Sequence, residues 1–486
     1  MTSTTAPSVH PVPPRRADLE IDEALRLRIA GQLAGRFQGA IIGPEDAEYA
    51  QARLVWNGMV DKYPGLILRC TSTADVAAAV DVARANGLSP AVRGGGHNVA
   101  GKAMSEGGLT IDLGGLRQVT VDAQRHLVQA GGGCLLGDVD AATAAHAMIV
   151  PAGIMSETGV GGLSLGGGIG WFSRKHGLTC DQFVELEVVL ASGEVVTSSA
   201  DKNADLFWAL RGGGGNFGVV TRFTFRAYDF GPMMRIGVSL YHVDDAAEAL
   251  REYASIYPTL GRNVGWHAAL KHDMPALPFV PPELVGARML MLISMWLDDA
   301  GDPAGVELID LLGAVGQPAV TASTVLPFGA GVQHIIDEEF ADGHRYYTKE
   351  AHVAVLAGEA IDRLVEFWKD MPMGGEVEVI GLGGAIGDVA EDATAFSHRE
   401  YLMWLNFAMS WDDPALDHEY MERTRAIVRD LKPWTGDGIY VNMLNVDEMD
   451  RVVEAYGAEK YAKLGRVKAQ YDPDNFFRTN YNITPR

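Results

Sequence analysis

The sequence predicts an α+β protein built from two domains. Its 486 residues are more than one ordinary hydrophobic core organises, so two domains are expected. Residues 41–230 show short strands, helices and glycine-rich turns in close succession, whereas from residue 231 longer helices alternate with strands and the glycine clusters thin out. Apolar residues make up 47% and charged residues 21% of the chain, the usual mixture for a soluble globular protein.

In the first block, residues 73–87 are expected to form a helix, because Ala and Val recur there at helical spacing. Thr73 is its expected N-cap, and Gly87 can end it. β-branched residues alternating with polar ones favour strands elsewhere in the block. These expected strands are 108–116, 118–133 and 217–230, and the remaining expected helices are 138–147 and 205–212.

The second block has expected helices at 243–257 and 349–370, and expected strands at 288–296, 376–382 and 401–411. The closing stretch, 471–486, begins with an Asp-Pro turn, continues as an apolar-polar strand and is expected to pack back on the first domain. The resulting boundaries are an arm with a first helix (1–40), a first domain (41–230), a second domain (231–444) and a returning segment (445–486).

The charge balance excludes several classes of partner. The 40 Lys and Arg residues against 63 Asp and Glu residues give a net charge of −23, which disfavours binding to nucleic acid or anionic membranes. The three cysteines are too few and too scattered for a disulfide framework or a zinc site, and no metal site is predicted. The polar, Pro-rich start lacks the apolar core of a secretory signal, and no run of apolar residues is long enough to span a membrane. These features fit a cytoplasmic enzyme. A monomer or homodimer is expected, although none of these features sets the oligomeric state.

Two short motifs suggest other classes of protein. Residues 213–218 match GxGxxG, but the expected helix precedes the glycines and the strand follows them, the reverse of a Rossmann dinucleotide site. Gly162, Ser164 and Gly166 match the GxSxG elbow of serine hydrolases, which needs a helix directly afterwards. The sequence GGIGWF that follows is a poor helix start, so a glycine loop lining a ligand is the favoured interpretation.

Glycine gathers in four places: 94–96, 131–133, 159–170 and 212–218. Few Lys or Arg residues lie beside these clusters. An acidic protein that binds an anionic cofactor without a basic patch must rely on backbone N–H groups. The four clusters therefore predict turns that cradle a diphosphate.

Five stretches, taken in order along the chain, resemble the sequence motifs of one known protein family. They are VRGGGHNVAG, DLGGLRQVTVD, PAGIMSETGVGGLSLGGGIGWFSRKHGLTCDQ, DLFWALRGGGGNFGVV and YDPDNFFRTNYNI. Together they resemble the berberine bridge enzyme-like FAD-linked oxidases of the vanillyl-alcohol oxidase superfamily, from about residue 55 to 482. The resemblance implies a two-part PCMH-type FAD-binding domain, formed by the first domain and the returning segment, and a substrate domain with a large antiparallel sheet flanked by helices.

The resemblance also implies how the cofactor is held. His97 stands where the family joins the flavin 8α-methyl group covalently to a histidine. The other positions implied to bind FAD are Arg93, Gly94, Gly95, Gly96, Asn98, Met155, Gly159, Val160, Gly161, Gly162, Ser164, Leu165, Gly168, Gly170, Gly218, Val219, Val220, Asn480 and Asn482.

Many relatives make a second link through a cysteine. Met155 falls at that position here, and Cys134 lies some 20 residues earlier after a different glycine cluster. The resemblance therefore implies a single, histidyl attachment, as in the 6-hydroxy-D-nicotine oxidase branch.

The sequence offers more than one candidate for the catalytic base. Glu376 and Glu378 share one face of an expected strand, so repulsion between them can raise the pKa of one and make it a base. The alternative is an exposed edge of charged residues. Asn406 stands where plant relatives carry a glutamate base, and an amide cannot take that role.

Tyr440 matches a family tyrosine, but its neighbour Met443 replaces an aromatic residue or histidine, so Tyr440 is either catalytic or structural. Together with Trp404, Met443 suggests an apolar pocket for an aromatic or polyketide-like substrate.

The predicted activity is transfer of a hydride from an alcohol or amine carbon of a small hydrophobic molecule to flavin N5, with oxygen as electron acceptor. A dehydrogenase or an oxidative cyclase of the same fold remains an alternative. The alternatives from other classes are a GxSxG serine hydrolase and a non-catalytic dinucleotide-binding module.

Overall fold

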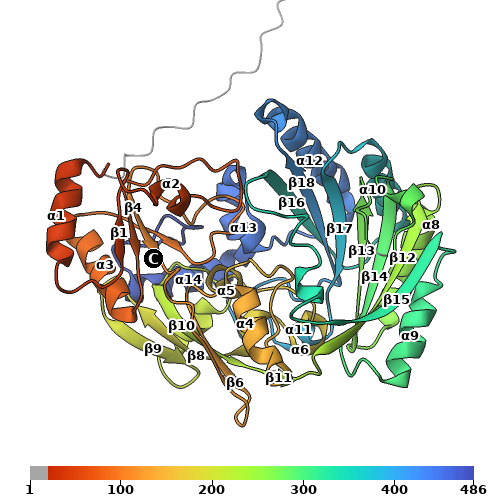
Figure 1. Cartoon of the computed structure of the whole chain (residues 1–486), viewed down its shortest axis with the longest axis horizontal. Coiled ribbons are helices and arrows are strands. Elements are labelled where there is room, and N and C mark those ends of the chain that lie inside the picture. Colours follow the sequence, from red (N-terminus) through yellow and green to blue (C-terminus); the bar gives the residue numbers. More distant parts are fainter. Residues whose placement is uncertain (1–19, 278) are drawn as a thin grey trace, which may run out of the picture.

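The computed structural model describes residues 20–277 and 279–486. Its elements form two lobes that lie side by side (Figure 1). The first lobe contains residues 20–230 together with helices α13 (Val452–Tyr456) and α14 (Ala458–Tyr471). The second lobe contains residues 233–431. The expected N-terminal arm falls mostly on residues 1–19, which lie outside the described part of the chain. The domain boundaries expected from the sequence remain predictions.

Two main sheets build the first lobe. One has the order β1-β2-β4-β3, with β2, β4 and β3 parallel, and the other is antiparallel with the order β5-β6-β10-β8-β9. A short pair, β7 and β11, adds to them. The strands are β1 (Ala40–Ile42), β2 (Leu66–Arg69), β3 (Ala91–Arg93), β4 (Leu109–Asp112), β5 (Val119–Asp122), β6 (Leu127–Gly131), β7 (Met148–Ile149), β8 (Phe183–Val189), β9 (Val195–Ser199), β10 (Val219–Arg226) and β11 (Tyr228–Asp229).

Helices lie at the three places in the first lobe where the sequence predicts them, but the predicted N-cap of the helix at 73–87 is wrong. Helix α3 begins at Thr73, but its N-cap is Ser72, whose Oγ accepts a hydrogen bond from the Asp75 N–H at 3.1 Å. Gly87 follows the helix with φ +68°, as the sequence predicted. The helices are α1 (Glu23–Leu33), α2 (Tyr49–Ala52), α3 (Thr73–Ala85), α4 (Leu136–Ala144), α5 (Val160–Leu165), α6 (Ser173–His176) and α7 (Ala204–Leu210).

One antiparallel sheet of seven strands dominates the second lobe, with the order β15-β12-β14-β13-β17-β18-β16. The strands are β12 (Met233–His242), β13 (Val264–Lys271), β14 (Met289–Trp296), β15 (Val320–Pro327), β16 (Arg345–Val353), β17 (Gly375–Gly381) and β18 (Met403–Trp411). The helices are α8 (Ala246–Ile256), α9 (Pro303–Gly313), α10 (Gly358–Asp370), α11 (Ala385–Asp388) and α12 (Asp417–Leu431).

The period of two along each strand divides this sheet into two unlike faces. On one face, Trp266, Leu270 and Phe407 pack with Tyr253 of α8 and Trp368 of α10 in a single apolar core. The residues between them point the other way, toward the first lobe. The polar side chains of the central strands therefore lie between the lobes rather than in solvent.

Two expected elements are wrong. The helix expected at 349–370 begins only at Gly358, because 349–353 belong to β16. Nine residue pairs join β16 to β18, and this pairing outweighs the helical propensity of Lys349, Glu350 and Ala351.

The strand expected in 471–486 is also wrong. This segment pairs with no sheet among the described residues and is instead held by hydrogen bonds to the first lobe. The Ser89 hydroxyl donates to the Phe476 carbonyl at 2.6 Å, and the Asn216 side chain donates to the Tyr481 carbonyl at 3.2 Å and accepts from the Ile483 N–H at 3.0 Å. Its expected return to the first domain agrees with these contacts.

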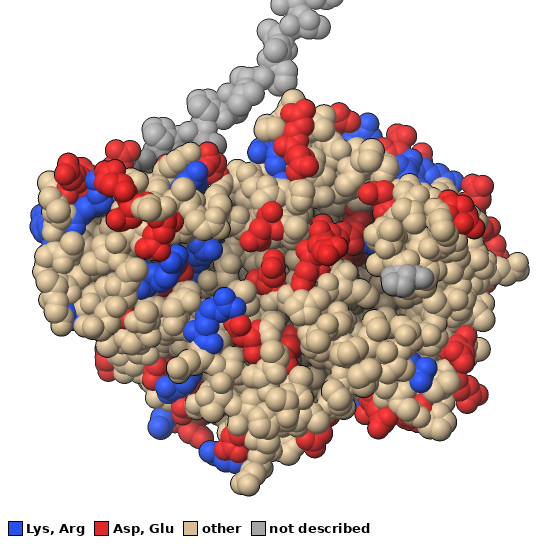
Figure 2. Space-filling view, in the orientation of Figure 1, with Lys and Arg blue, Asp and Glu red and all other residues tan. Residues whose placement is uncertain are grey.

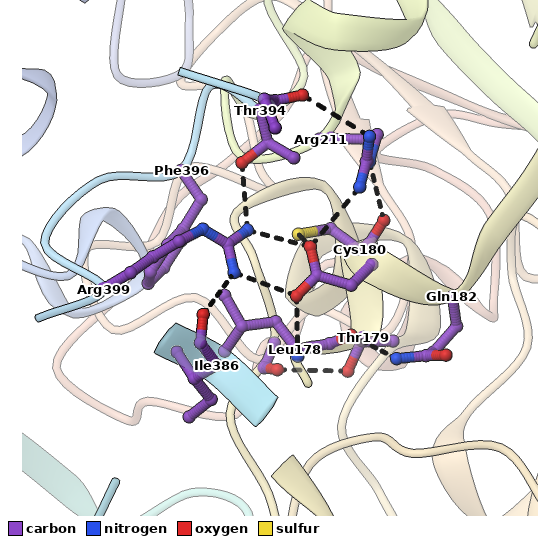
Figure 3. Close-up of polar contacts among 12 residues, drawn as sticks. Leu178, Thr179, Cys180, Gln182, Arg211, Ile386, Thr394, Phe396 and Arg399 are labelled. Atoms are coloured by element: carbon purple, nitrogen blue, oxygen red, sulfur yellow. Dashed lines mark hydrogen bonds and ion pairs between the residues drawn. The ribbon is translucent and has the colours of Figure 1, made fainter. Parts of the chain in front are cut away.

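A buried ion pair joins the lobes. Arg399, in the segment before β18, makes two hydrogen bonds to Asp181 at 2.9 and 2.8 Å, and their side chains are only 3% and 6% exposed. Figure 3 shows Arg399 and Arg211 approaching the 3₁₀ turn Thr179–Gln182 from different sides, with Arg399 also reaching Thr394 and Ile386. This network fixes the second lobe to the first.

Across the described ranges, no helix combines the length and the apolar content that would be needed to cross a bilayer.

Replacing Arg399 by Met is expected to lower the free energy of unfolding by about 3 kcal/mol, because Asp181 would keep a buried charge without its main partner. Guanidinium chloride denaturation measures this. The matched control is Arg262→Met, which breaks an exposed ion pair with Asp388 and should leave stability nearly unchanged. Equal losses in the two variants would contradict the role given to the buried pair.

Candidate active site

A cavity of about 380 Å³ lies between the lobes. Glycine-rich segments at 94–96, 159–162 (the start of helix α5) and 214–218 form part of one side, and strands β13, β17 and β18 form part of the other. Figure 2 shows Asp and Glu side chains beside the hollow between the lobes, with Lys and Arg side chains also near it on the side of the first lobe.

Two glycines allow the turns of the first lobe to touch. A Cβ atom added to Gly95 would lie 2.5 Å from the backbone N and Cα of Gly159, and one added to Gly159 would lie 2.2 Å from the Gly95 nitrogen. Any side chain at either position would push one backbone away from the other. Gly96 adds a φ of +82°, which residues with side chains rarely adopt.

Other glycines leave bare backbone facing the open space. Gly162 and Gly215 both line the cavity, and a Cβ atom added to either would meet nothing within 4 Å. No packing requirement explains the missing side chain at these two positions. A ligand that approaches the backbone closely does explain it.

His97 is held flat against an aromatic stack. Its ring lies 4.3 Å from that of Trp56 at an interplanar angle of 17°, and Trp56 stacks in turn on Tyr346 of the second lobe. The buried Nε2 atom of His97 has no hydrogen-bond partner in the described part of the chain. Burial lowers the pKa of His97 to about 4, so the imidazole is neutral at pH 7 and keeps a free lone pair.

Met155, which the resemblance implied to stand at the position of a second tether, lines the cavity. Cys134 lies elsewhere: it is fully buried, and its thiol faces the carbonyl oxygens of Leu116 and Gln118 at 3.9 and 3.5 Å. Burial raises the pKa of Cys134 to about 11, which leaves the thiol protonated.

Most of the residues that sequence analysis assigned to FAD do line this cavity. They are Gly94, Gly95, Gly96, His97, Asn98, Met155, Gly159, Gly161, Gly162, Leu165, Gly170, Gly218, Val219, Val220 and Asn480. Five of the expected residues are not among those that line it: Arg93, Val160, Ser164, Gly168 and Asn482. Arg93 instead donates to the Ala52 carbonyl at 2.7 Å and supports the turn from behind.

The four residues proposed as catalytic, Glu376, Glu378, Asn406 and Tyr440, all line the cavity as well. Strand β17 lies between β13 and β18, so the alternative of an exposed charged edge is wrong. Glu376 is only 6% exposed, and Glu378 accepts a hydrogen bond from the Asn406 amide at 2.6 Å. Burial raises the pKa of both glutamates.

Sequence reasoning missed Lys271, the last residue of β13. It is paired with Glu376 in the ladder, and its Nζ donates to Glu376 Oε2 and to Glu339 Oε1, each at 2.5 Å. The signal that could have placed Lys271 on the cavity face is the alternation of side chains along 264–271. There, every second residue (Trp266, Ala268, Leu270) faces the apolar core, and the residues between them (His267, Ala269, Lys271) face the cavity.

Tyr440 is poorly suited to act as a base. Its hydroxyl oxygen accepts hydrogen bonds from the Gly168 N–H at 3.0 Å and from the Asn442 amide at 2.8 Å. Burial raises the pKa of Tyr440 to about 12, so the hydroxyl keeps its proton at pH 7.

Glu350, on β16, was also missed because the segment was expected to be helical. It pairs in register with Asn406, and its side chain is 4% exposed. One of its carboxyl oxygens accepts a hydrogen bond from the Tyr440 N–H at 2.7 Å. Burial raises the pKa of Glu350 to about 8.

The two motifs that suggested other classes gain no support. The Ser164 hydroxyl is fully buried and has no hydrogen-bond partner among the described residues, so no base contacts it. The glycines at 213–218 follow helix α7 and precede strand β10, the reverse of the Rossmann order.

Comparisons with known proteins agree with this geometry. A family model described as FAD binding domain matches residues 64–199, and one described as berberine and berberine like matches residues 439–484. (R)-6-hydroxynicotine oxidase from Paenarthrobacter nicotinovorans is 31% identical over 472 residues, which cover 92% of this chain and 97% of the relative. The chain belongs to the berberine bridge enzyme-like family of FAD-linked oxidoreductases.

Other members of this family give the same result. An uncharacterized FAD-linked oxidoreductase from Bacillus subtilis is 29% identical, with 93% of this chain and 98% of the relative covered. The crystal structure of 6-hydroxy-D-nicotine oxidase from Arthrobacter nicotinovorans has a TM-score of 0.82 at 27% identity, covering 93% of this chain and 98% of that chain. The fold, the enzyme class and FAD as cofactor, all predicted from the sequence, are confirmed.

The residues present fit FAD. The bare backbone at Gly162 and Gly215 suits the close approach of a diphosphate, and the unpartnered Nε2 atom marks His97 as a group whose bonding is incomplete in the protein alone. Asn98, Asn480 and the turns at 94–96 and 159–162 complete the wall on this side.

Replacing Gly159 by Ala is expected to lower the free energy of unfolding by about 1–3 kcal/mol, because the new methyl group would overlap the backbone of Gly95. The control is Gly162→Ala in helix α5, whose methyl group meets open space and should not lower the free energy of unfolding. Chemical denaturation of both variants tests the contact, and a stable Gly159→Ala protein would argue against it.

Proposed function

We propose that this chain is an oxidase that holds FAD through one covalent bond, from His97 to the flavin 8α-methyl group. Its substrate is a small hydrophobic alcohol or amine of the kind found in secondary metabolism, and molecular oxygen is the electron acceptor. The chemistry that FAD supplies when bound is acceptance of a hydride, at N5, from a substrate C–H bond. The observation that carries the proposal is one cavity with an unpartnered imidazole on one side and two carboxyl groups on the other.

The state of His97 supports covalent attachment. A bond to the flavin needs a neutral imidazole with an available lone pair, and burial keeps His97 in that form at pH 7. The stack with Trp56 fixes the plane of the ring, so little conformational freedom is left to lose when the bond forms.

Single attachment is supported by the absence of a suitable thiol at the second position. Met155, which lines the cavity, cannot form the thioether that a cysteine would form. The thiol of Cys134 is buried, protonated and engaged with backbone carbonyl groups, so it is no substitute.

The sheet side of the cavity suits removal of a proton from a substrate O–H or N–H group. Glu378, whose pKa is raised by burial, can hold that proton, and the Asn406 amide fixes the carboxyl group through a hydrogen bond. Tyr440 keeps its own proton, so its part is to position groups near Gly168 and Asn442.

The substrate class rests on the other side chains that line the cavity. Met291, Ile293, Phe340, Trp404 and Met443 give it an apolar, partly aromatic surface. A relative that shares 31% of its sequence is named as an oxidase of (R)-6-hydroxynicotine, a small aromatic molecule, which supports both the oxidase activity and this size of substrate.

Acid precipitation of the purified, yellow holoenzyme tests the attachment. Flavin colour and fluorescence should stay with the pellet of the wild type and of Cys134→Ala, and should wash out of His97→Ala. The reason is that the His97 ring has an unpartnered nitrogen on the cofactor side of the cavity, which the Cys134 thiol does not line. Flavin that washes out of the wild-type pellet, or is retained by His97→Ala, would overturn the proposed bond.

Oxygen consumption across a panel of aromatic alcohols and amines then identifies a usable substrate and separates an oxidase from a dehydrogenase. With that substrate, Glu378→Gln should slow anaerobic flavin reduction by about 10²–10⁴-fold, because the amide cannot accept the proton. The wild-type rate should fall as pH drops through the raised pKa of Glu378. Unchanged reduction rates in Glu376→Gln and Glu378→Gln would remove the glutamates from the mechanism.

A further inference from the structure

Lys271 is the cation that approaches the paired glutamates. It ends strand β13, is 4% exposed, and donates to Glu376 of the neighbouring strand and to Glu339 of the segment between β15 and β16. Glu378 makes no such contact, and its carboxyl group is bonded instead to the neutral Asn406 amide. The two glutamates are therefore unequal, although they differ by only two positions on one strand.

Glu376 and Glu378 also differ in how far their side chains are exposed. Glu376 is 6% exposed and contacts Lys271, whereas Glu378 is only partly buried and remains partly open to the cavity. A proton exchanged with a substrate can reach Glu378 more directly.

The remaining groups that face the pair from neighbouring elements do not compensate its charge. His267 of β13 accepts a hydrogen bond from the Gly381 N–H, and burial lowers its pKa to about 4, so it is neutral. Glu350 of β16 lies beyond Asn406 in the ladder and adds no positive charge. Around this part of the cavity the described residues thus offer one ammonium group for the carboxyl groups of Glu339, Glu376 and Glu378.

We propose that Lys271 is the positioning residue that keeps Glu376 as a carboxylate and so leaves Glu378 as the single glutamate that exchanges a proton with the substrate. This inference rests on the proposed oxidase function, which it deepens by dividing the roles of the two glutamates. A buried ammonium group stabilises the adjacent carboxylate far more than the one beyond it, because Coulomb attraction falls with distance and the surroundings are poorly polarisable.

The charge balance of the site agrees with this division. Burial raises the pKa of Glu376, and the strongest opposing influence is the charge of Lys271. Burial also raises the pKa of Glu378, but there the strongest opposing influence is the Asn406 hydrogen bond. For Lys271, burial favours the neutral form, but the charges of Glu376 and Glu339 outweigh it and raise its pKa.

Infrared pH-difference spectra of the purified holoenzyme, without substrate, test the proposal. The bands of protonated carboxyl groups are assigned by their loss in Glu376→Gln and in Glu378→Gln, while the Asp140 and Glu350 bands remain as internal references. In Lys271→Met the midpoint of the Glu376 band should move up by about 1–3 pH units, because the stabilising cation is gone. Lys271→Arg keeps the charge and should largely restore the wild-type midpoint.

A second variant is expected to shift a midpoint in the opposite direction, and it keeps the lysine itself and its bond to Glu376. Glu339→Gln removes a negative charge near Glu378 and leaves Lys271 to Glu376 alone, so the Glu378 midpoint should move down. If Lys271→Met does not fold, this shift and the Lys271→Arg spectrum still decide the matter. Unmoved midpoints in Lys271→Met, or in Glu339→Gln where only that variant folds, would overturn the role of Lys271.

The two proposals fail in different ways. Flavin reduction that is unaffected by Glu378→Gln would refute the proposed base, even if the infrared midpoints shift as expected. Fixed midpoints together with a large kinetic effect of Glu378→Gln would refute the role of Lys271 alone.

Discussion

The backbone contact between Gly95 and Gly159 is the constraint on which the cofactor side of the cavity depends. It sets the separation of two turns that are more than sixty residues apart in the sequence, and it tolerates no side chain at either position. His97 follows directly after the first turn, so the contact also sets where its imidazole stands. The stack of His97, Trp56 and Tyr346 then carries this geometry into the second lobe.

The substrate side depends on a different constraint, the alternation of side chains across a sheet that is buried on both faces. One face packs its large apolar residues against α8, α10 and α12. Because this core already buries much apolar surface, the opposite face can carry polar side chains. Burying Lys271, Glu376 and Asn406 there is costly unless each finds a partner, and each does. The ion pair of Asp181 and Arg399 keeps the two lobes in contact, so the polar face remains enclosed.

Much of this arrangement could be predicted from the sequence, because its signals are local. The glycine clusters, the lone His97 and the two-residue spacing of Glu376 and Glu378 each lie within a short stretch. Lys271 could not be assigned a role in that way, since its partners come from a neighbouring strand and a distant segment. Glu350 was hidden because Lys, Glu and Ala favour a helix in isolation, whereas nine ladder pairs with β18 decide the structure.

The order in which the chain is synthesised has a consequence for when the cofactor can be enclosed. The wall that carries His97 is completed by Asn480 and Tyr481, and the Asn98 amide donates directly to the Tyr481 hydroxyl at 3.0 Å. The ribosome makes residues 41–230 first and needs on the order of tens of seconds to reach residue 481. The first lobe therefore lacks the part of the cavity wall formed by Asn480 and Tyr481 while the seven-stranded sheet is being synthesised. The wall of the cavity around His97 is therefore closed only after residues 480 and 481 have been made.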